Sequence, residues 1–228
     1  PMLRIDTDTL LLSRPTRSFD VRLTAATLGE GARPRLTHLA LAGSRGRPAA
    51  ADPDVLAPIS PLPVPERAQG DYPNGGVLCS PTSLSMVLNH FRWPGDMPEV
   101  QQGVYDPEYA GTGNWTFNAA YAGSRPGLRS TVARLGSAGE LMPWLNAGVP
   151  PILSVSLDLL KGKEKDNGGG HLVVLVGFDA NGDPIMNDPA WRGAVRRTYK
   201  RADFERAWAF SKHTVYLVWP EDRPVPSL

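Results

Sequence analysis

The stretch YPNGGVLCSPTSLSMVLNHF, residues 72–91, holds the only cysteine of the chain, Cys79. A lone thiol cannot form an internal disulfide and is too little for a structural zinc site, so it serves either packing or chemistry. Free cysteines are most often buried small hydrophobes, and packing is therefore the competing interpretation. If a helix begins here, the positive end of its dipole favours the thiolate, the form that attacks carbonyl carbon.

The residues after the cysteine have the spacing of a helix. Apolar side chains recur three, four and seven residues apart and lie on one face: Leu84, Val87, Leu88 and Phe91. Ser80 or Thr82 can cap this helix, and Pro81 is acceptable in its first turn, where no intrahelical N–H bond is required. We therefore expect a helix that begins at or just after the cysteine.

The composition excludes several classes of protein. Of the 228 residues, 41% are hydrophobic and 21% are charged, which is ordinary for a globular domain. The formal net charge is +1 and no Lys/Arg-rich run occurs, which argues against a nucleic-acid partner. No apolar run approaches the roughly 18 residues that span a bilayer, and no signal segment is visible. No His, Cys or carboxylate cluster has metal-ligand spacing, so we expect neither a metal nor a cofactor.

The composition and residue pattern of the chain divide it into three segments. Residues 1–45 predict an N-terminal β-strand segment, because stretches such as RSFDVRLTAAT (17–27) alternate apolar and polar positions. Because the chain opens on Pro1-Met2, we expect a leader or more of an N-terminal domain upstream. The strands either pack on the rest of the chain or belong to a larger β-module that begins there. Residues 46–64 are rich in proline and alanine and predict an extended linker. Residues 65–228 form the main predicted domain.

Within this domain helices precede strands, which predicts an α+β fold with an antiparallel sheet. Further helices are expected over residues 97–104, 114–122 and 138–146. From residue 150 onward the segments with strand character are PILSVSL, HLVVLVGFDA, PIMND, AVRRTYK and TVYLVW, with one helix, ADFERAWA, before the last.

Among the four histidines, His171 is the best candidate for the base that a nucleophilic thiol requires. It follows the glycines 168–170 and opens the apolar run LVVLVGF, which predicts a buried strand that fixes the imidazole at its end. The glycines leave room for a substrate backbone. His90 lies about three turns along the cysteine helix and is too far away. His38 falls in the N-terminal segment, and His213 opens the final strand.

The segment IMNDPAW supplies a group that can orient the histidine, either Asn187 or Asp188. Neighbouring residues of a strand point to opposite faces, so only one of them can face the ring. Turn formation before Pro189 is the alternative role for both. A two-residue hairpin at Asn181-Gly182 would place Asp188 opposite Leu175 rather than near the histidine. A wider loop or a bulge is therefore required, and we predict a bulge because Pro184 disturbs the ladder.

The segments CSPTSLSMVL and GGHLVVLVGFDANGDPIMNDPA resemble the papain-like cysteine peptidases of family thirty-nine, the bacteriocin-processing or double-glycine-leader peptidases. They are most similar to the transporter-free, C39-like second branch, and the resemblance covers residues 65–220 or so. It implies a papain-like α+β fold with a nucleophile helix. It also implies that Cys79 is the nucleophile, His171 the general base and Asp188 its orienter.

The resemblance implies a fourth residue as well. A family glutamine upstream of the cysteine lends its amide to the oxyanion hole, and here it matches Gln69 in ERAQGDYPNGG. The gap to Cys79 is longer than in papain-type sequences and holds a Gly-rich insert. The Gln69 amide and the Cys79 N–H would face the oxyanion of the tetrahedral intermediate, and Asn74 is a local competitor for this role.

The function that the resemblance implies is a thiol hydrolase, a peptidase or amidase that acts on a peptide or amide substrate through an acyl-enzyme. A catalytically silent papain-like binding module and an acyl transferase with the same triad are the alternatives. Relatives of this branch are often exported, so we expect an extracytoplasmic location; the sequence does not indicate an oligomeric state. We expect the loop 160–169 to border the cleft and Trp191 to shield the His171–Asp188 bond from water.

Overall fold

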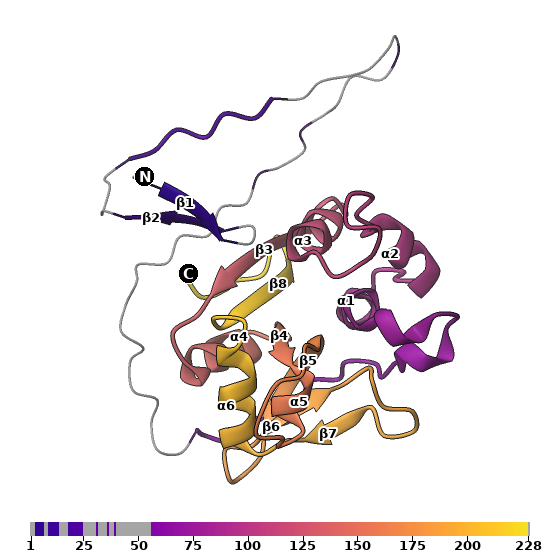
Figure 1. The fold of residues 1–228 in the computed structure, drawn as a ribbon, viewed down its shortest axis with the longest axis vertical. Coiled ribbons are helices and arrows are strands. Elements are labelled where there is room, and N and C mark those ends of the chain that lie inside the picture. Colours follow the sequence, from indigo (N-terminus) through magenta and orange to yellow (C-terminus); the bar gives the residue numbers. More distant parts are fainter. Residues whose placement is uncertain are drawn as a thin grey trace. The chain divides into compact units, whose positions relative to one another are not determined.

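The computed structural model describes residues 3–6, 9–13, 18–24, 31, 36, 39 and 56–227, and the chain forms two compact units, Pro1–Leu39 and Ala40–Leu228 (Figure 1). In the first unit, β1 (Leu3–Asp6) and β2 (Thr9–Leu12) pair as an antiparallel hairpin. Residues 18–24 form no strand, although their sequence alternates, because no described segment pairs with them. The other predicted strand, LTHLALAGS, lies almost wholly outside the described residues.

The second unit is built on a six-stranded antiparallel sheet. Its strand order is β3-β8-β4-β5-β6-β7. The strands are β3 (Leu128–Arg134), β4 (Ile152–Ser156), β5 (Gly170–Phe178), β6 (Pro184–Asn187), β7 (Arg196–Thr198) and β8 (Thr214–Pro220). The five strands predicted after residue 150 are present. Strand β3 was not predicted from the sequence, although its β-branched pair Thr131-Val132 was an available signal.

Helices cover both faces of this sheet (Figure 1). They are α1 (Cys79–His90), α2 (Met97–Gly103), α3 (Trp115–Gly123), α4 (Met142–Asn146), α5 (Leu157–Leu160) and α6 (Arg201–Ala209), with 3-10 turns η1 (Gln69–Asp71), η2 (Gly75–Val77) and η3 (Ala138–Leu141). The order of helices and strands confirms the α+β prediction.

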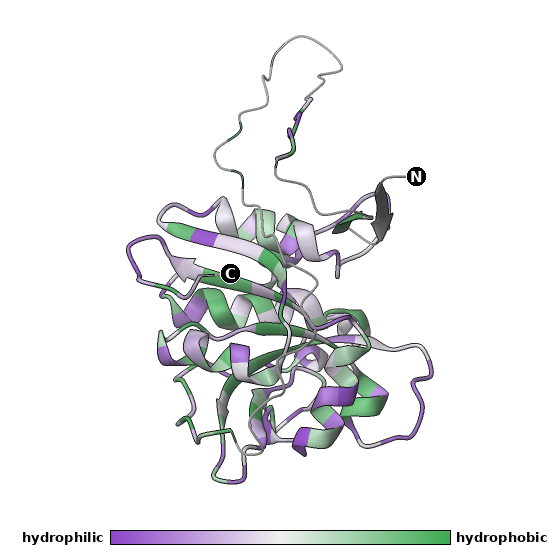
Figure 2. Ribbon diagram, turned by 90° about the vertical axis from the view of Figure 1, so that its left-hand side faces the viewer, coloured by the Kyte–Doolittle hydropathy of each residue, from purple (hydrophilic) through white to green (hydrophobic). Residues whose placement is uncertain are grey.

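The side chains of β5 alternate between two cores. Leu172, Val174 and Val176 pack in the core that holds the apolar residues of α1, whereas Val173 and Leu175 pack in the core that holds those of α6. A strand buried on both faces reads as a continuous apolar run, as LVVLV does. Figure 2 shows the resulting concentration of hydrophobic residues on the central strands. The strand is thereby fixed from both sides.

The register between β5 and β6 is set by two irregularities. Asp179 N bonds Asp183 O, so the hairpin loop has three residues rather than two, and Gly182 takes the positive φ of 77° that such a loop requires. The register then shifts between Leu175 and Gly177, which is a bulge on β5. The predicted bulge is confirmed, and the wider loop is present as well.

The bulge does not lie at Pro184, where we expected its cause. It lies where the segment 59–62 crosses β5: Leu62 N bonds Val176 O at 2.9 Å. A Cβ on Gly177 would lie 2.4 Å from Ile59 O, so only glycine allows the two backbones to approach this closely. The extra residue therefore follows from a backbone that packs on the strand.

Candidate active site

Cys79 is the first residue of α1 and is half-buried. The expected caps are wrong: Leu78 precedes the helix with no side-chain cap, and the Ser80 hydroxyl instead bonds Asn118 Oδ1 at 3.0 Å. Thr82 Oγ1 is buried without a partner among the described residues. The first turn therefore keeps its backbone N–H groups free of side-chain acceptors, which suits a negative charge beside them.

His171 and Asp188 form a buried pair. The ring Nε2 lies 2.7 Å from Asp188 Oδ1, and the two residues are 3% and 0% exposed. Val174 pairs with Asn187, so Asp188 comes opposite Val173, two residues from the histidine and on the same face. Side chains that are diagonal neighbours across two strands can reach one another.

The neighbouring Asn187 turns the other way. Its amide Nδ2 lies 3.2 Å from Val64 O and 3.3 Å from Pro65 O, and its Oδ1 accepts a bond from Arg196 Nε at 3.0 Å. The choice that the sequence left open is thus resolved in favour of Asp188. Asn187 instead holds the crossing segment, residues 56–65, against the sheet.

The charge states of the site depend on one another. Burial alone would raise the pKa of the Cys79 thiol, but the hydrogen bond and charge of His171 outweigh it and lower this pKa, assisted by the backbone N–H groups of Leu172 and Ser80. Burial would lower the pKa of His171, but the bonds and charges of Asp188 and Cys79 raise it to about 9. Together these shifts favour a thiolate–imidazolium pair.

The carboxylate has a second buried partner, which the sequence did not reveal. The Tyr199 hydroxyl donates to Asp188 Oδ2 at 2.5 Å, and the Ala190 N–H donates to Oδ1 at 2.9 Å. Burial would raise the pKa of Asp188, but its bonds to His171, Tyr199 and Ala190 lower it. The carboxylate is therefore ionised and held at both oxygens.

Trp191 is linked to the Asp188 carboxylate through the Tyr199 hydroxyl. Its Nε1 donates to the Tyr199 hydroxyl at 3.2 Å. It contacts the residue that binds Asp188, and the shielding of the His171–Asp188 bond from water stays a prediction. The sequence signal for Tyr199 was only an aromatic residue in the strand segment AVRRTYK.

The backbone of Gln69 is held next to the His171–Asp188 pair, because its N–H donates to the carbonyl of Pro189, the residue after Asp188, at 2.8 Å. The Gly-rich insert before Cys79 folds into η1 and η2, which pack so closely that a Cβ on Gly75 would lie 2.3 Å from Gln69 O. Gln69 Oε1 is buried without a partner among the described residues. Asn74, the competitor, is exposed and has a positive φ of 58°.

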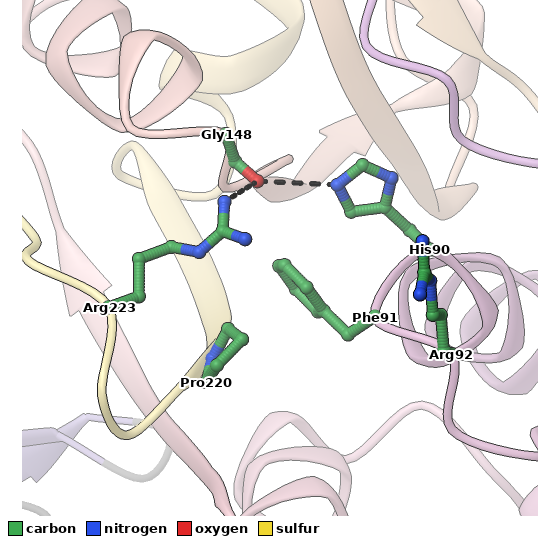
Figure 3. A pocket seen from close by; sticks show the side chains of 6 residues that line it. All are labelled: His90, Phe91, Arg92, Gly148, Pro220 and Arg223. Carbon is green, nitrogen blue, oxygen red and sulfur yellow. Dashed lines mark hydrogen bonds between the residues drawn. The ribbon is translucent and has the colours of Figure 1, made fainter.

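The histidine at the other end of α1 belongs to a different hollow, lined by His90, Phe91, Arg92, Gly148, Pro220 and Arg223 (Figure 3). As expected, this histidine takes no part in the Cys79 site. Among the described residues, no group of three or more His, Cys, Asp or Glu side chains could hold a metal ion. Nor does the described part of the chain contain a helix with the length and hydropathy of a membrane span.

Fold and site together define a papain-like arrangement, in which a cysteine at a helix N-terminus meets a histidine and an acid from an antiparallel sheet. The Peptidase_C39 like family matches residues 61–216, and the chain belongs to this family. A comparison with curated proteins finds no match.

Two solved structures are similar. One, described as a C39-like peptidase from Bacillus anthracis, is 18% identical with a TM-score of 0.57, and the match covers 70% of this chain and 96% of that one. The other, a double glycine motif protease from an AMS/PCAT transporter in complex with the leader peptide, is 19% identical with a TM-score of 0.50, covering 72% and 99%. At these identities the likeness shows the fold.

Proposed function

We propose that the protein is a thiol hydrolase that cuts a peptide or related amide bond through an acyl-enzyme on Cys79. The observation that carries the proposal is the His171 ring, which binds Asp188 through Nε2 and interacts with Cys79. Membership of the C39-like family supports a peptidase. The fold is shared with a protease that was solved with a peptide bound, which makes a peptide the first substrate class to test.

The residues can be assigned to the steps of the reaction. The Cys79 thiolate attacks the carbonyl carbon, and the oxyanion takes hydrogen bonds from the Cys79 N–H and the Gln69 amide. The C–N bond breaks as the His171 imidazolium gives its proton to the leaving amine. Water then attacks the thioester and loses a proton to His171, which releases the acid and restores the thiolate. Asp188 holds the ring and stabilises its charge throughout.

Alkylation of Cys79 by iodoacetamide across pH 4 to 10 tests this proposal, in the native protein and in His171→Ala. The thiolate exists above the lowered pKa of Cys79, and the imidazolium exists below about 9. We therefore expect fast alkylation with an apparent pKa well below the ordinary value of about 8.5. The substitution should return both rate and pKa to those of an ordinary thiol.

Turnover of peptide substrates should show the matching profile, with kcat/KM falling above about pH 9 as the imidazolium loses its proton. Slow alkylation with an ordinary thiol pKa that His171→Ala leaves unchanged would contradict the proposal and favour a silent binding module. Addition of amine acceptors separates hydrolysis from acyl transfer, because a transferase would pass the acyl group to the amine.

A further inference from the structure

Two cations lie against the indole ring of Trp191, next to the proposed catalytic residues. Lys161 Nζ is 5.0 Å from the centroid of the ring, and Arg197 Cζ is 4.0 Å from it. The same indole donates to the Tyr199 hydroxyl at 3.2 Å, and that hydroxyl donates to the carboxylate of Asp188 at 2.5 Å. The cations thus rest on a ring that lies two hydrogen bonds from the triad carboxylate.

Neither cation forms an ion pair within the described part of the chain, whereas two other arginines of this region do. Arg192 pairs with Asp71 at 3.1 Å, and Arg196 lies 3.8 Å from Glu66. The distances of Lys161 and Arg197 from the indole are both measured to the same ring centroid. Their charges are therefore at most 9.0 Å apart, the sum of the two distances. Like charges this close repel, and an anion placed beside both would offset the repulsion.

The chemistry of the reaction indicates which part of a substrate reaches this ring. His171 gives its proton to the leaving amine, so the amine half of the substrate lies on the imidazole side of the sulfur. Two elements near His171 carry the cations. Lys161 follows α5, whose preceding strand pairs Ser156 with Gly170 just before the histidine, and Arg197 lies in the edge strand β7.

Space is available along this approach. A Cβ built on Gly169 or Gly170 would meet no atom within 4 Å, so neither glycine is required by packing within the protein. Both stand immediately before His171, at the point where an extended substrate would pass. A backbone without side chains at this edge permits the close approach of another chain.

We propose that Lys161 and Arg197 form a carboxylate subsite that receives an acidic side chain of the peptide on the amine side of the cleaved bond. This rests on the proposed function, because the reaction places the amine half there. The pair suits a carboxylate: a guanidinium stacked on an indole keeps its N–H groups for bidentate contact with two oxygens, and the ammonium adds a point charge. The indole keeps the guanidinium in place.

Protection of Cys79 tests the subsite without requiring turnover. The alkylation rate with iodoacetamide is measured in the presence of the amide of tri-glutamate or of tri-glutamine, both with a free amino terminus that mimics the released amine. We expect tri-glutamate to slow alkylation about three- to tenfold more than tri-glutamine at low ionic strength, and added salt to reduce this difference. The double substitution K161Q/R197Q should remove it.

The matched control is R92Q/K200Q, which removes the same charge from two other exposed positions, neither of which has a cation–π contact with the indole. This control should keep the preference for tri-glutamate. Equal protection by both peptides, a preference that survives K161Q/R197Q, or a preference lost equally in R92Q/K200Q would each overturn the subsite. Failure of the proposed function is distinguishable, since it appears as an ordinary thiol pKa without added peptide.

A peptide library cut by the native protein and read by mass spectrometry gives a second measurement. Acidic residues should be enriched in the first positions on the amine side of the cuts, and the enrichment should disappear in K161Q/R197Q. Cleavage without this enrichment would overturn the subsite even if the hydrolase proposal holds.

Discussion

Each end of helix α1 lies beside a histidine whose ring nitrogens face partners, His90 of the helix itself at one end and His171 of β5 at the other, and only the second end is suited to chemistry. At the C-terminal end, His90 Nδ1 lies 3.4 Å from Pro63 O. Its Nε2 lies 3.3 Å from Gly148 O (Figure 3). At the N-terminal end, His171 contacts a carboxylate and a thiol. Backbone carbonyls only accept, so they hold a ring without exchanging protons with it.

The difference extends to the charges that each end of the helix favours. The partial positive charge at the N-terminus supports the Cys79 thiolate, whereas the negative C-terminal end lies near the guanidinium of Arg223, which binds Ala147 O at 2.9 Å and Gly148 O at 3.2 Å. The same residue type is thus bound to backbone carbonyls at one end and placed beside a thiol and a carboxylate at the other, where the proposed function makes it reactive. The partners, and not the histidine itself, determine which of the two it is.

Replacing each histidine by alanine tests this comparison most strongly. We expect His171→Ala to reduce kcat/KM on a peptide substrate about 10⁴-fold or more, because the thiol loses its base and its charge partner. His90→Ala should leave the reactivity of Cys79 unchanged and lower only the free energy of unfolding, by about 1 kcal/mol, through its lost polar contacts. Thermal melts and iodoacetamide kinetics on both variants check this, and a large loss of thiol reactivity in His90→Ala would refute the division.

Asp188→Ala tests whether the carboxylate makes the difference between the two ends. Without it, the buried ring loses its orienter and its counter-charge, and we expect kcat/KM to fall about 10²- to 10⁴-fold. The pKa of His171 should fall from about 9, since the bond and charge of Asp188 both raise it. NMR titration of the ring measures this shift, and an unchanged titration would show that the carboxylate plays no such part.

Gln69→Ala tests whether a residue outside Cys79, His171 and Asp188 contributes to the reaction at the N-terminal end of α1. If its amide binds the oxyanion, kcat should fall about 10²- to 10³-fold while the alkylation rate of Cys79 stays the same, because alkylation forms no oxyanion. Asn74→Ala is the matched control, since it truncates the exposed competitor. A larger loss in Asn74→Ala than in Gln69→Ala would assign the role to Asn74 instead.

Tyr199→Phe should produce the smallest effect, and it tests whether the second partner of the Asp188 carboxylate tunes the pKa of His171. Without the hydroxyl, Asp188 Oδ2 loses its donor, and more of the carboxylate charge is available to His171. The falling limb of the kcat/KM profile should therefore move above about pH 9, with a loss in kcat of about three- to tenfold.

Tyr121→Phe is the control, because the Tyr121 hydroxyl bonds the exposed Glu99 at 3.2 Å. Its pH profile should match that of the native protein. A profile of Tyr199→Phe that also coincides with the native one, at any level of activity, would mean that Tyr199 only packs.

The main elements were accessible from the sequence because their patterns are local. The run LVVLVGF marks a strand buried on both faces, and the spacing after Cys79 marks the helix. The strand β3 was missed, because LRSTVAR alternates weakly and its edge position requires no continuous apolar run. The alternation of residues 18–24 did not produce a strand, because a strand also needs a partner, and pattern alone supplies none.

The candidate site divides in the same way. Cys79, His171 and Asp188 stand in recognisable contexts, and the need for an irregular hairpin followed from counting residues. The location of the bulge did not follow, because it depends on the crossing segment that contacts Val176 from more than a hundred positions away. Tyr199 could not be predicted either, since its hydroxyl reaches Asp188 only after the fold has set the register of β6 and β7.

The crossing segment also determines how a mechanical force would reach the site. A pull on the chain upstream of Leu56 is first carried by the two bonds between Ile59 and Phe178 and then by the bond from Leu62 to Val176 at the bulge. These bonds lie on β5, the strand that carries His171 near its start. The segment upstream of Leu56 is therefore tethered through the same backbone that sets the register of the β5–β6 hairpin. Tension on it would change the spacing of His171 and Asp188 before it strained α1.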